Sequence, residues 1–335
     1  MLKYTKSSEI MNTEEDFIAC DKVEYKTKIR VVRNSLLITV PQKMVYEFKL
    51  EKGAPLFIIL KQNDKNIKFL TRLSHGAYVY LANIPNHKEF QLEKREANIE
   101  ILFNQRIRKS SKNKGILDIS ELDLSKIDYF IDGNKIYLYY KSPSAKKGNL
   151  INRFLAINSE LAYVIGLYDA EGAENSFRFT NSDPRLIEMF LENVKNIFGL
   201  KEYDFDAQIT RVCKGKESSS KEFWSNKFPD INIYNKISYK YGNGVKFGSL
   251  SVLINTLTML SIWDSLRNKM KSMIISDKTL SASYIAGILD GDGCVYLDKD
   301  LRSIISIRIT CDSRSDCSFI IDCLKNLDIS FKMED

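Results

Sequence analysis

The alternation of apolar and polar residues identifies a first structural unit near the start of this 335-residue chain. Between residues 26 and 60 the pattern has the two-residue period of strands, with a turn at 33–35. Pro41 then opens a short helix, because proline is favoured at the first helical position, and Gly53 precedes a last strand. We predict a β–β–α–β unit of about 36 residues, too small to enclose a core alone. It must dock on another segment or dimerise.

Strand-like patterns continue beyond this unit. Residues 1–23 lack a clear period and are predicted to be a flexible terminus, whereas 63–148 form a β-rich middle region. Gly133, flanked by Asp132 and Asn134, predicts a tight hairpin turn. The small, polar and basic stretch SPSAKKGN, residues 142–149, is the best linker in the sequence.

After this linker the chain repeats itself. VIGLYDAEG, residues 164–172, and IAGILDGDG, residues 285–293, are both apolar, helix-like runs that end at an acid followed by glycine. The strand–helix pattern of residues 176–197 returns at 306–327. Because the order of elements also recurs, we infer a duplication with copies at 150–271 and 281–335, the second apparently incomplete.

The two helix-like runs predict a site. Gly166 and Gly287 destabilise a helix by about 1 kcal/mol relative to alanine, which a close approach of two helices would offset. Packing through these glycines would bring Glu171 and Asp292 together at the negative ends of both helices. Such carboxylates repel each other, and Mg²⁺ or another divalent cation would relieve the repulsion. Paired metals can support phosphodiester hydrolysis.

Alternation in the strands of both copies separates an apolar face from a face suited to nucleic acid. In the first copy Arg178 and Thr180 oppose phenylalanines. In the second, isoleucines oppose a polar set comprising Arg302, Ser306, Arg308 and Thr310. Arginine, serine and threonine suit phosphates and base edges. The alternative is a solvated sheet face.

Composition narrows the class of protein. Formal net charge is +7, hydrophobic content is 44%, and no apolar run reaches the length of a membrane span. We expect a cytoplasmic protein with its six cysteines reduced, and only two histidines make a histidine-based metal site nearly impossible. Residues 101–117 carry five cationic side chains and no acid, which indicates either a solvated loop or a phosphate-contacting arm.

The paired helix-like runs resemble the LAGLIDADG homing endonucleases, over about residues 155–335. This resemblance implies metal binding by Glu171 and Asp292, whereas Asp169 and Asp290 would shape the helix ends. It also implies a pseudo-dimer of αββαββα repeats, the second copy short, whose saddle-shaped antiparallel sheet binds double-stranded DNA. Arg178 and Arg308 would then reach DNA from the same concave sheet.

Residues 24–62 resemble the AbrB/SpoVT swapped-hairpin domains through Asn34, Ser35, Val40, Pro41 and Gly53, although Arg33 and Ala54 depart from that pattern. The resemblance implies a homodimer in which strands of two chains interleave. Its candidate DNA contacts are Lys26, Lys28, Arg30 and Arg33. A hairpin used only for dimerisation, or docking of the unit on residues 63–140 of the same chain, are the alternatives.

Together these patterns predict an α+β protein with an AbrB-like β unit, a β-rich middle and a LAGLIDADG-like half. The first hypothesis for function is a sequence-specific, Mg²⁺-dependent DNA endonuclease, with Lys240 or Lys246 as an assisting basic group. The second is a DNA-binding transcriptional regulator that does not cleave. RNA splicing assistance is a third class allowed by the family, and no residue favours it.

Overall fold

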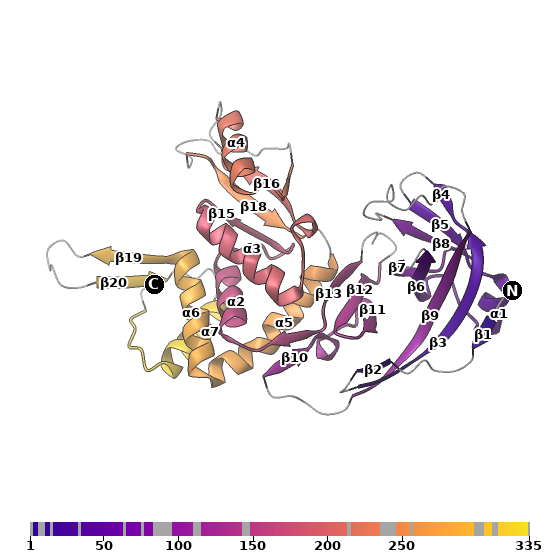
Figure 1. Ribbon diagram of the computed structural model, residues 1–335. Coiled ribbons are helices and arrows are strands. Elements are labelled where there is room, and N and C mark those ends of the chain that lie inside the picture. The colour runs from indigo at the N-terminus through magenta and orange to yellow at the C-terminus, as the bar shows by residue number, and fades with distance from the viewer. Residues whose placement is uncertain are drawn as a thin grey trace. The chain divides into compact units, whose positions relative to one another are not determined.

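The computed structural model of the chain is mixed α+β (Figure 1). It describes the chain except for these residues: 1–2, 6–10, 14–15, 33–34, 63–64, 75–76, 83–95, 110–114, 143–147, 213–215, 235–245, 255–256, 298–304, 310–313 and 334–335. No helix of the described part combines the length and the hydropathy that a membrane span requires.

The chain forms two compact units. Unit 1 comprises residues 1–114 and 124–153, and unit 2 comprises 115–123 and 154–335. The division falls after Arg153, a few residues beyond the predicted linker at 142–149. Residues 115–123 join unit 2 because β10 (Ile116–Asp118) pairs with β14 (Phe154–Ala156).

Unit 1 is built on a six-stranded antiparallel sheet in the order β1-β3-β9-β6-β7, with β2 also paired to β3. Its strands are β1 (Lys3–Thr5), β2 (Met11–Thr13), β3 (Asp16–Lys28), β6 (Pro55–Gln62), β7 (Lys65–Arg72) and β9 (Glu96–Lys109). β3 therefore runs through residues 16–23, so the prediction of a flexible terminus is wrong there. β9 likewise makes the first part of the basic stretch a strand rather than a loop.

A smaller sheet in the order β4-β5-β8 accompanies the larger one. Its strands are β4 (Arg30–Val32), β5 (Ser35–Thr39) and β8 (Tyr78–Ala82). Helix α1 (Gln42–Glu47) follows Pro41, and Gly53 adopts a φ of 90° before β6. The predicted strand–strand–helix–strand order is confirmed for this segment.

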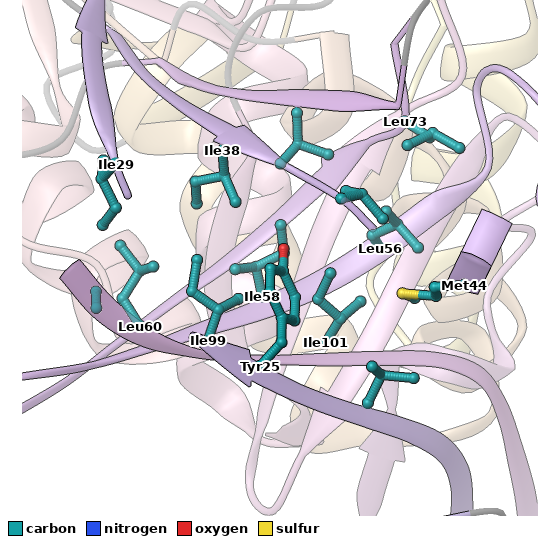
Figure 2. Close-up of a cluster of buried hydrophobic side chains, with 14 of the residues drawn as sticks. Tyr25, Ile29, Ile38, Met44, Leu56, Ile58, Leu60, Leu73, Ile99 and Ile101 are labelled. Atoms are coloured by element: carbon teal, nitrogen blue, oxygen red, sulfur yellow. The ribbon is translucent and has the colours of Figure 1, made fainter. Parts of the chain in front are cut away.

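The core of unit 1 shows how this segment is completed. Figure 2 shows side chains from β3, β5, β6, β9 and α1 converging on one apolar cluster. Ile38, Ile58 and Ile101 are fully buried there, and the hydroxyl of Tyr25 donates to the carbonyl of Thr39 at 3.0 Å. Since β5 pairs with β8, and β6 with β7 and β9, this chain supplies the missing core itself. The unit therefore does not need a second chain to complete its core. Strand exchange between two chains stays a prediction.

A third sheet, β11-β12-β13, covers the other face of the large sheet. Its strands are β11 (Ile127–Asp132), β12 (Lys135–Tyr140) and β13 (Asn149–Asn152). Phe57 stacks on Phe130 with ring centres 4.0 Å apart, and the amide of Gln105 exchanges two hydrogen bonds with the backbone of Ile131, of 2.7 and 2.8 Å. Gly133, with a φ of 60°, makes the predicted hairpin turn.

Unit 2 contains the other helices. They are α2 (Ser159–Glu171), α3 (Pro184–Phe198), α4 (Glu217–Lys227), α5 (Leu257–Ser276), α6 (Lys278–Asp292) and α7 (Arg314–Asn326), with the 3₁₀ turn η2 (Glu202–Asp204); unit 2 also contains η1 (Ile119–Glu121). Asn158 and Asp277 cap the starts of α2 and α6 by accepting backbone N–H bonds. Both predicted motif runs therefore lie on helices that begin at a capping residue.

Two further sheets belong to unit 2. One has the order β15-β18-β16-β17 and the other is the hairpin β19-β20. The strands are β15 (Arg178–Asn181), β16 (Asp206–Thr210), β17 (Asn232–Ile233), β18 (Ser249–Leu253), β19 (Gly293–Leu297) and β20 (Ile305–Ile309). Arg178 and Arg308 thus lie on different sheets, which corrects the expectation of one shared sheet.

The order of elements also differs from the expected αββαββα repeat. In the first copy the leading strand is reduced to a single bridge between Gly172 and Phe179, because Ser176 follows Glu171 by only five positions. β17 pairs parallel to β16, so the first sheet is not purely antiparallel. In the second copy the described part follows the order α6-β19-β20-α7. The specific pseudo-dimer fold stays a prediction.

Candidate functional site

Helices α2 and α6 cross through glycine. A β-carbon built on Gly166 would lie 2.1 Å from the carbonyl oxygen of Tyr284, and one on Gly287 would lie 2.2 Å from that of Tyr163. Both values are far below a van der Waals contact, so only glycine allows this backbone approach. The helices lie side by side as the motif spacing predicted (Figure 1).

A reciprocal pair of hydrogen bonds joins the two helices. Tyr163 of α2 donates to Asp290 of α6 at 2.7 Å, and Tyr284 of α6 donates to Asp169 of α2 at 2.9 Å. Each tyrosine lies three residues before its motif glycine, and each aspartate three residues after. The two copies therefore meet as equivalents, and the inner aspartates bind the opposite helix.

The symmetry of these bonds is broken by α5. Arg267 forms an ion pair with Asp169 and lies over the ring of Tyr168, 5.6 Å from its centre. Burial raises the pKa of Asp169, and the charge of Arg267 opposes that shift. Arg267 thus compensates a carboxylate that packing has withdrawn from water.

We expect Arg267→Met to destabilise unit 2 by about 2 kcal/mol, because it leaves the carboxylate of Asp169 buried beside an apolar side chain. Thermal unfolding measures the effect. The matched control is Lys278→Met, whose ion pair with Asp328 at 2.6 Å is exposed, and which should leave the melting temperature unchanged. Equal effects of the two substitutions would contradict this role of Arg267.

The ends of α2 and α6 bring two carboxylates together. Gly172 and Gly293 end the helices where a β-carbon would meet the backbone of the last turn, 2.4 Å from Tyr168 O and 2.3 Å from Leu289 O. A β-carbon on Gly291 would lie 3.3 Å from Cγ of Glu171. The end of α6 therefore lies beside the Glu171 side chain.

Electrostatics record the same proximity. Burial, and then the negative charge of Asp292, raise the pKa of Glu171 to about 7, while the charge of Arg211 opposes them. Asn181 donates to Oε1 of Glu171 at 2.9 Å, and its own oxygen accepts from the backbone N–H of Asp183 at 2.8 Å. Glu171 is therefore half-buried, held in position and deprived of its full charge at neutral pH.

This pKa predicts a pH dependence of stability. The unfolded carboxyl titrates near 4.5 and the folded one near 7, so between these values the folded state holds a proton that the unfolded state has released. The free energy of unfolding should fall as pH rises through this window and level off above it. Because solvent screens a half-buried group, we expect a loss of about 1–2 kcal/mol.

The substitution Glu171→Gln should remove this dependence. In EDTA, the variant should melt a few degrees higher than the parent at pH 8 and at the same temperature near pH 4.5. Added Mg²⁺ should raise the melting temperature of the parent at pH 8 and leave that of the variant unchanged. Parallel melting curves across the whole pH range would show that Glu171 titrates normally.

The acid pair fits a divalent cation. Mg²⁺ binds through one or two carboxylates and completes its shell with waters and phosphate oxygens. Glu171 and Asp292 supply that donor set, and the charge of Asp292, which adds to burial in raising the pKa of Glu171, is the repulsion that a cation would remove. The described residues contain no cluster of three or more His, Cys, Asp or Glu side chains that could hold a metal. Any ion here would depend on water or substrate for its remaining ligands.

The predicted nucleic-acid residues of the first copy lie on β15. Thr180 shares a hydrogen bond of 2.8 Å with Ser251 of β18, which in turn lies opposite Gln208. Phe179 points the other way and stacks on Phe190 of α3 at 4.3 Å. Nε of Arg178 is buried and has no hydrogen-bond partner among the described residues. The sheet therefore has a polar face, with Thr180, Ser251 and Gln208, opposite its helix layer.

The other predicted contacts are less defined. Arg308 is exposed on β20, Arg30 is exposed at the start of β4, and the backbones of Ser306 and Lys28 lie in β20 and β3. Four predicted residues fall outside the described part of the chain, namely Arg33, Lys240, Arg302 and Thr310. Lys28 and Arg30 belong to unit 1, whereas the acid pair belongs to unit 2.

A basic group that sequence reasoning did not name acts on Glu171, while the prediction for Lys240 and Lys246 stays a prediction. Lys246 is exposed and lies over the ring of Phe247, 4.9 Å from its centre. The cation whose charge lowers the pKa of Glu171 is Arg211, just after β16. Its φ of 55° is unusual for a residue with a side chain, and such backbones concentrate at functional sites.

Sequence reasoning also missed Asn181 and the two tyrosines. Tyr163 and Tyr284 stand at the same distance before the glycine in the two copies of the motif. Their repetition could therefore have indicated a shared role. Nothing local distinguishes Asn181 or Arg211, because their roles depend on how β15 and β16 lie against the end of α2.

No protein-family model, curated protein or solved structure matches this chain. The features of the molecule that bear on its function are therefore the acid pair, its surroundings and the polar face of β15.

Proposed function

We propose that this protein is a sequence-specific endonuclease of double-stranded DNA that requires Mg²⁺ or another divalent cation. The observation that supports the proposal is the junction of α2 and α6, where the helices cross at Gly166 and Gly287 and the charge of Asp292 acts on Glu171. In a protein that only binds DNA, two acids that repel each other would lower stability and repel the phosphates. In phosphodiester hydrolysis the same two acids can hold the catalytic metal ions.

The surrounding residues support the same function. Asn181 fixes the orientation of the Glu171 carboxylate, and Arg211 places a positive charge near it that could neutralise a phosphate. When bound, the cation would supply charge stabilisation at the phosphate and lower the pKa of the attacking water. The polar face with Arg178 and Thr180 would hold the duplex through phosphate and base contacts.

Incubation of the full chain with a pool of supercoiled plasmids carrying random inserts tests the proposal. Mg²⁺ should yield nicked and linear products whose ends map to a common sequence, and EDTA should abolish them. Saturable binding to a selected sequence without cleavage at any Mg²⁺ concentration would instead support the competing hypothesis of a regulator.

We expect Arg178→Ala to weaken specific DNA binding by about 1–3 kcal/mol if the side chain reads a base, because a bidentate contact is lost. If the side chain holds a phosphate instead, the slope of the logarithm of the binding constant against the logarithm of the salt concentration should become smaller by about one unit. Arg308→Ala should behave similarly. Fluorescence anisotropy at several salt concentrations measures both quantities.

The control for this series is Lys227→Ala, because Lys227 pairs with Glu188 at 3.5 Å on the helical side of unit 2. It should change neither quantity. Unaltered binding by both arginine variants would place these residues on a solvated face.

A further inference from the structure

The carboxylate of Glu171 is held by a chain of hydrogen bonds that begins at helix α3. Asp183 caps α3 by accepting from the backbone N–H of Arg185 at 2.9 Å, and its own N–H donates to Oδ1 of Asn181 at 2.8 Å. Since Oδ1 is engaged by this N–H, the amide turns its NH₂ group toward Oε1 of Glu171, 2.9 Å away. The donor that faces Glu171 therefore has a direction fixed by the start of a helix.

The second copy of the motif has a different residue at the position of Asn181. Residues 176–180 align with 306–310 through their shared serine, arginine and threonine, and the next residue is Asn181 in one copy and Cys311 in the other. Cys311 lies outside the described residues. Its thiol has a single weak donor, so it cannot replace the amide of asparagine.

The two acids of the helix ends are also unequal. Glu171 carries one more methylene group than Asp292, and it is half-buried, whereas Asp292 is exposed. An exposed carboxylate samples more orientations than one held by packing and by a directed hydrogen bond. The two acids therefore offer a cation ligands that differ in how far they are preorganised.

The inner aspartates show the same inequality one turn earlier. The side chain of Asp169 is 12% exposed and forms an ion pair with Arg267 of α5, in addition to its bond from Tyr284. Asp290, its equivalent on α6, accepts from Tyr163 and is exposed. The end of α2 is therefore tied to a third helix by an ionic contact at its buried aspartate.

We propose that the protein cuts the two strands of its DNA target in a fixed order, beginning with the strand whose reacting phosphate lies at Glu171, and that Asn181 is the positioning residue that sets this order. The inference rests on the proposed function. A carboxylate that is already oriented needs no reorganisation when the cation and the phosphate arrive, whereas an exposed one must be ordered at that step. Side chains that orient a metal ligand typically contribute about 10–100-fold to metal affinity or activity.

Each cut consumes one water molecule. The oxygen of the water bonds to phosphorus while the bond from phosphorus to one sugar oxygen breaks. One proton of the water ends on that sugar oxygen, and the other remains with the new terminal phosphate or passes to solvent. The same reaction therefore occurs on both strands, and only the orientation of the carboxylate differs between them.

A duplex of the selected target sequence, labelled with a different fluorophore on each strand, tests the order. With the full chain and Mg²⁺, one strand should be cut at least about tenfold faster than the other, so that nicked duplex accumulates. Asn181→Leu should slow this strand by about 10–100-fold and the other strand by less than about threefold. Both rates come from one reaction, so a loss of folded protein slows both strands equally and cancels in their ratio.

Binding of Mn²⁺ without DNA gives a readout that does not depend on cleavage, because carboxylates and water suit Mn²⁺ as they suit Mg²⁺. Electron paramagnetic resonance of the free ion should show about tenfold or more weaker binding to Asn181→Leu than to the parent. The matched control is Asn326→Leu, which removes an amide that donates to Ser281 at 3.0 Å elsewhere in unit 2. It should change neither the strand ratio nor the affinity for Mn²⁺.

The outcomes separate this proposal from the proposed function. Cleavage of both strands at equal rates would overturn the fixed order and leave the endonuclease intact. A strand ratio and a Mn²⁺ affinity that Asn181→Leu leaves unchanged, or that Asn326→Leu changes equally, would overturn the role of Asn181. Failure to cut either strand at any Mg²⁺ concentration would overturn the proposed function and the order of cleavage with it.

Discussion

Replacing Glu171 with glutamine is expected to lower the rate of DNA cleavage by about 10²–10³-fold and to leave DNA affinity equal or slightly higher. The substitution keeps the shape of the side chain and an oxygen that can accept from Asn181, but it removes the charge that a divalent cation would require. Losing a negative charge near phosphates also reduces repulsion of the duplex. Asp292→Asn should act in the same direction.

Nicking of the plasmid pool measures the rate, and anisotropy with Ca²⁺ measures affinity. The matched control is Glu174→Gln, because Glu174 is an exposed acid in the turn just after α2 and should leave both quantities unchanged. If the Glu171 and Asp292 variants cleave at the parental rate, the paired carboxylates take no part in the chemistry. Loss of DNA binding together with cleavage would point to misfolding instead.

Gly166→Ala is expected to destabilise unit 2 by about 3 kcal/mol or more, because its methyl group would meet the backbone of Tyr284 at 2.1 Å. Backbone atoms cannot rotate away as a side chain could, so the two helices must separate. The helix propensity gained from alanine, about 1 kcal/mol, is too small to offset this. Gly287→Ala should have a similar effect.

Thermal unfolding should show a fall of about 6–12 °C for either variant. Ala286→Ser is the control, because Ala286 neighbours Gly287 on the exposed side of α6. It should shift the midpoint by no more than about 1–2 °C. An unchanged midpoint in both glycine variants would contradict the close crossing of α2 and α6.

These two predictions depend on the feature that sequence reasoning identified most completely. Two apolar runs ending in acid–glycine specified two helices, their contact through Gly166 and Gly287, and the electrostatic effect of Asp292 on Glu171. Each inference used a local property, namely helix period, the absence of a side chain, or like charge. The same holds for the turn at Gly133 and the short helix after Pro41.

Pairing between distant strands was beyond such reasoning. The chain before residue 24 has little period of its own, yet Asp16–Lys28 is a long strand because it pairs with Glu96–Lys109. Likewise, the β–β–α–β unit obtains its core from later strands of the same chain. Hydrogen bonding between strands depends on a partner whose position the local pattern does not contain.

The sequence by itself therefore determined the two copies, their helices and the acids at the helix ends. Only the tertiary structure decided that Asn181 and Arg211 surround Glu171, that Arg267 compensates Asp169, and that Arg178 and Arg308 lie on separate sheets. The physical reason is the distance along the chain over which each property acts. Period, glycine and charge act over a few residues, whereas burial and the pKa of a carboxylate depend on every segment that folding brings beside it.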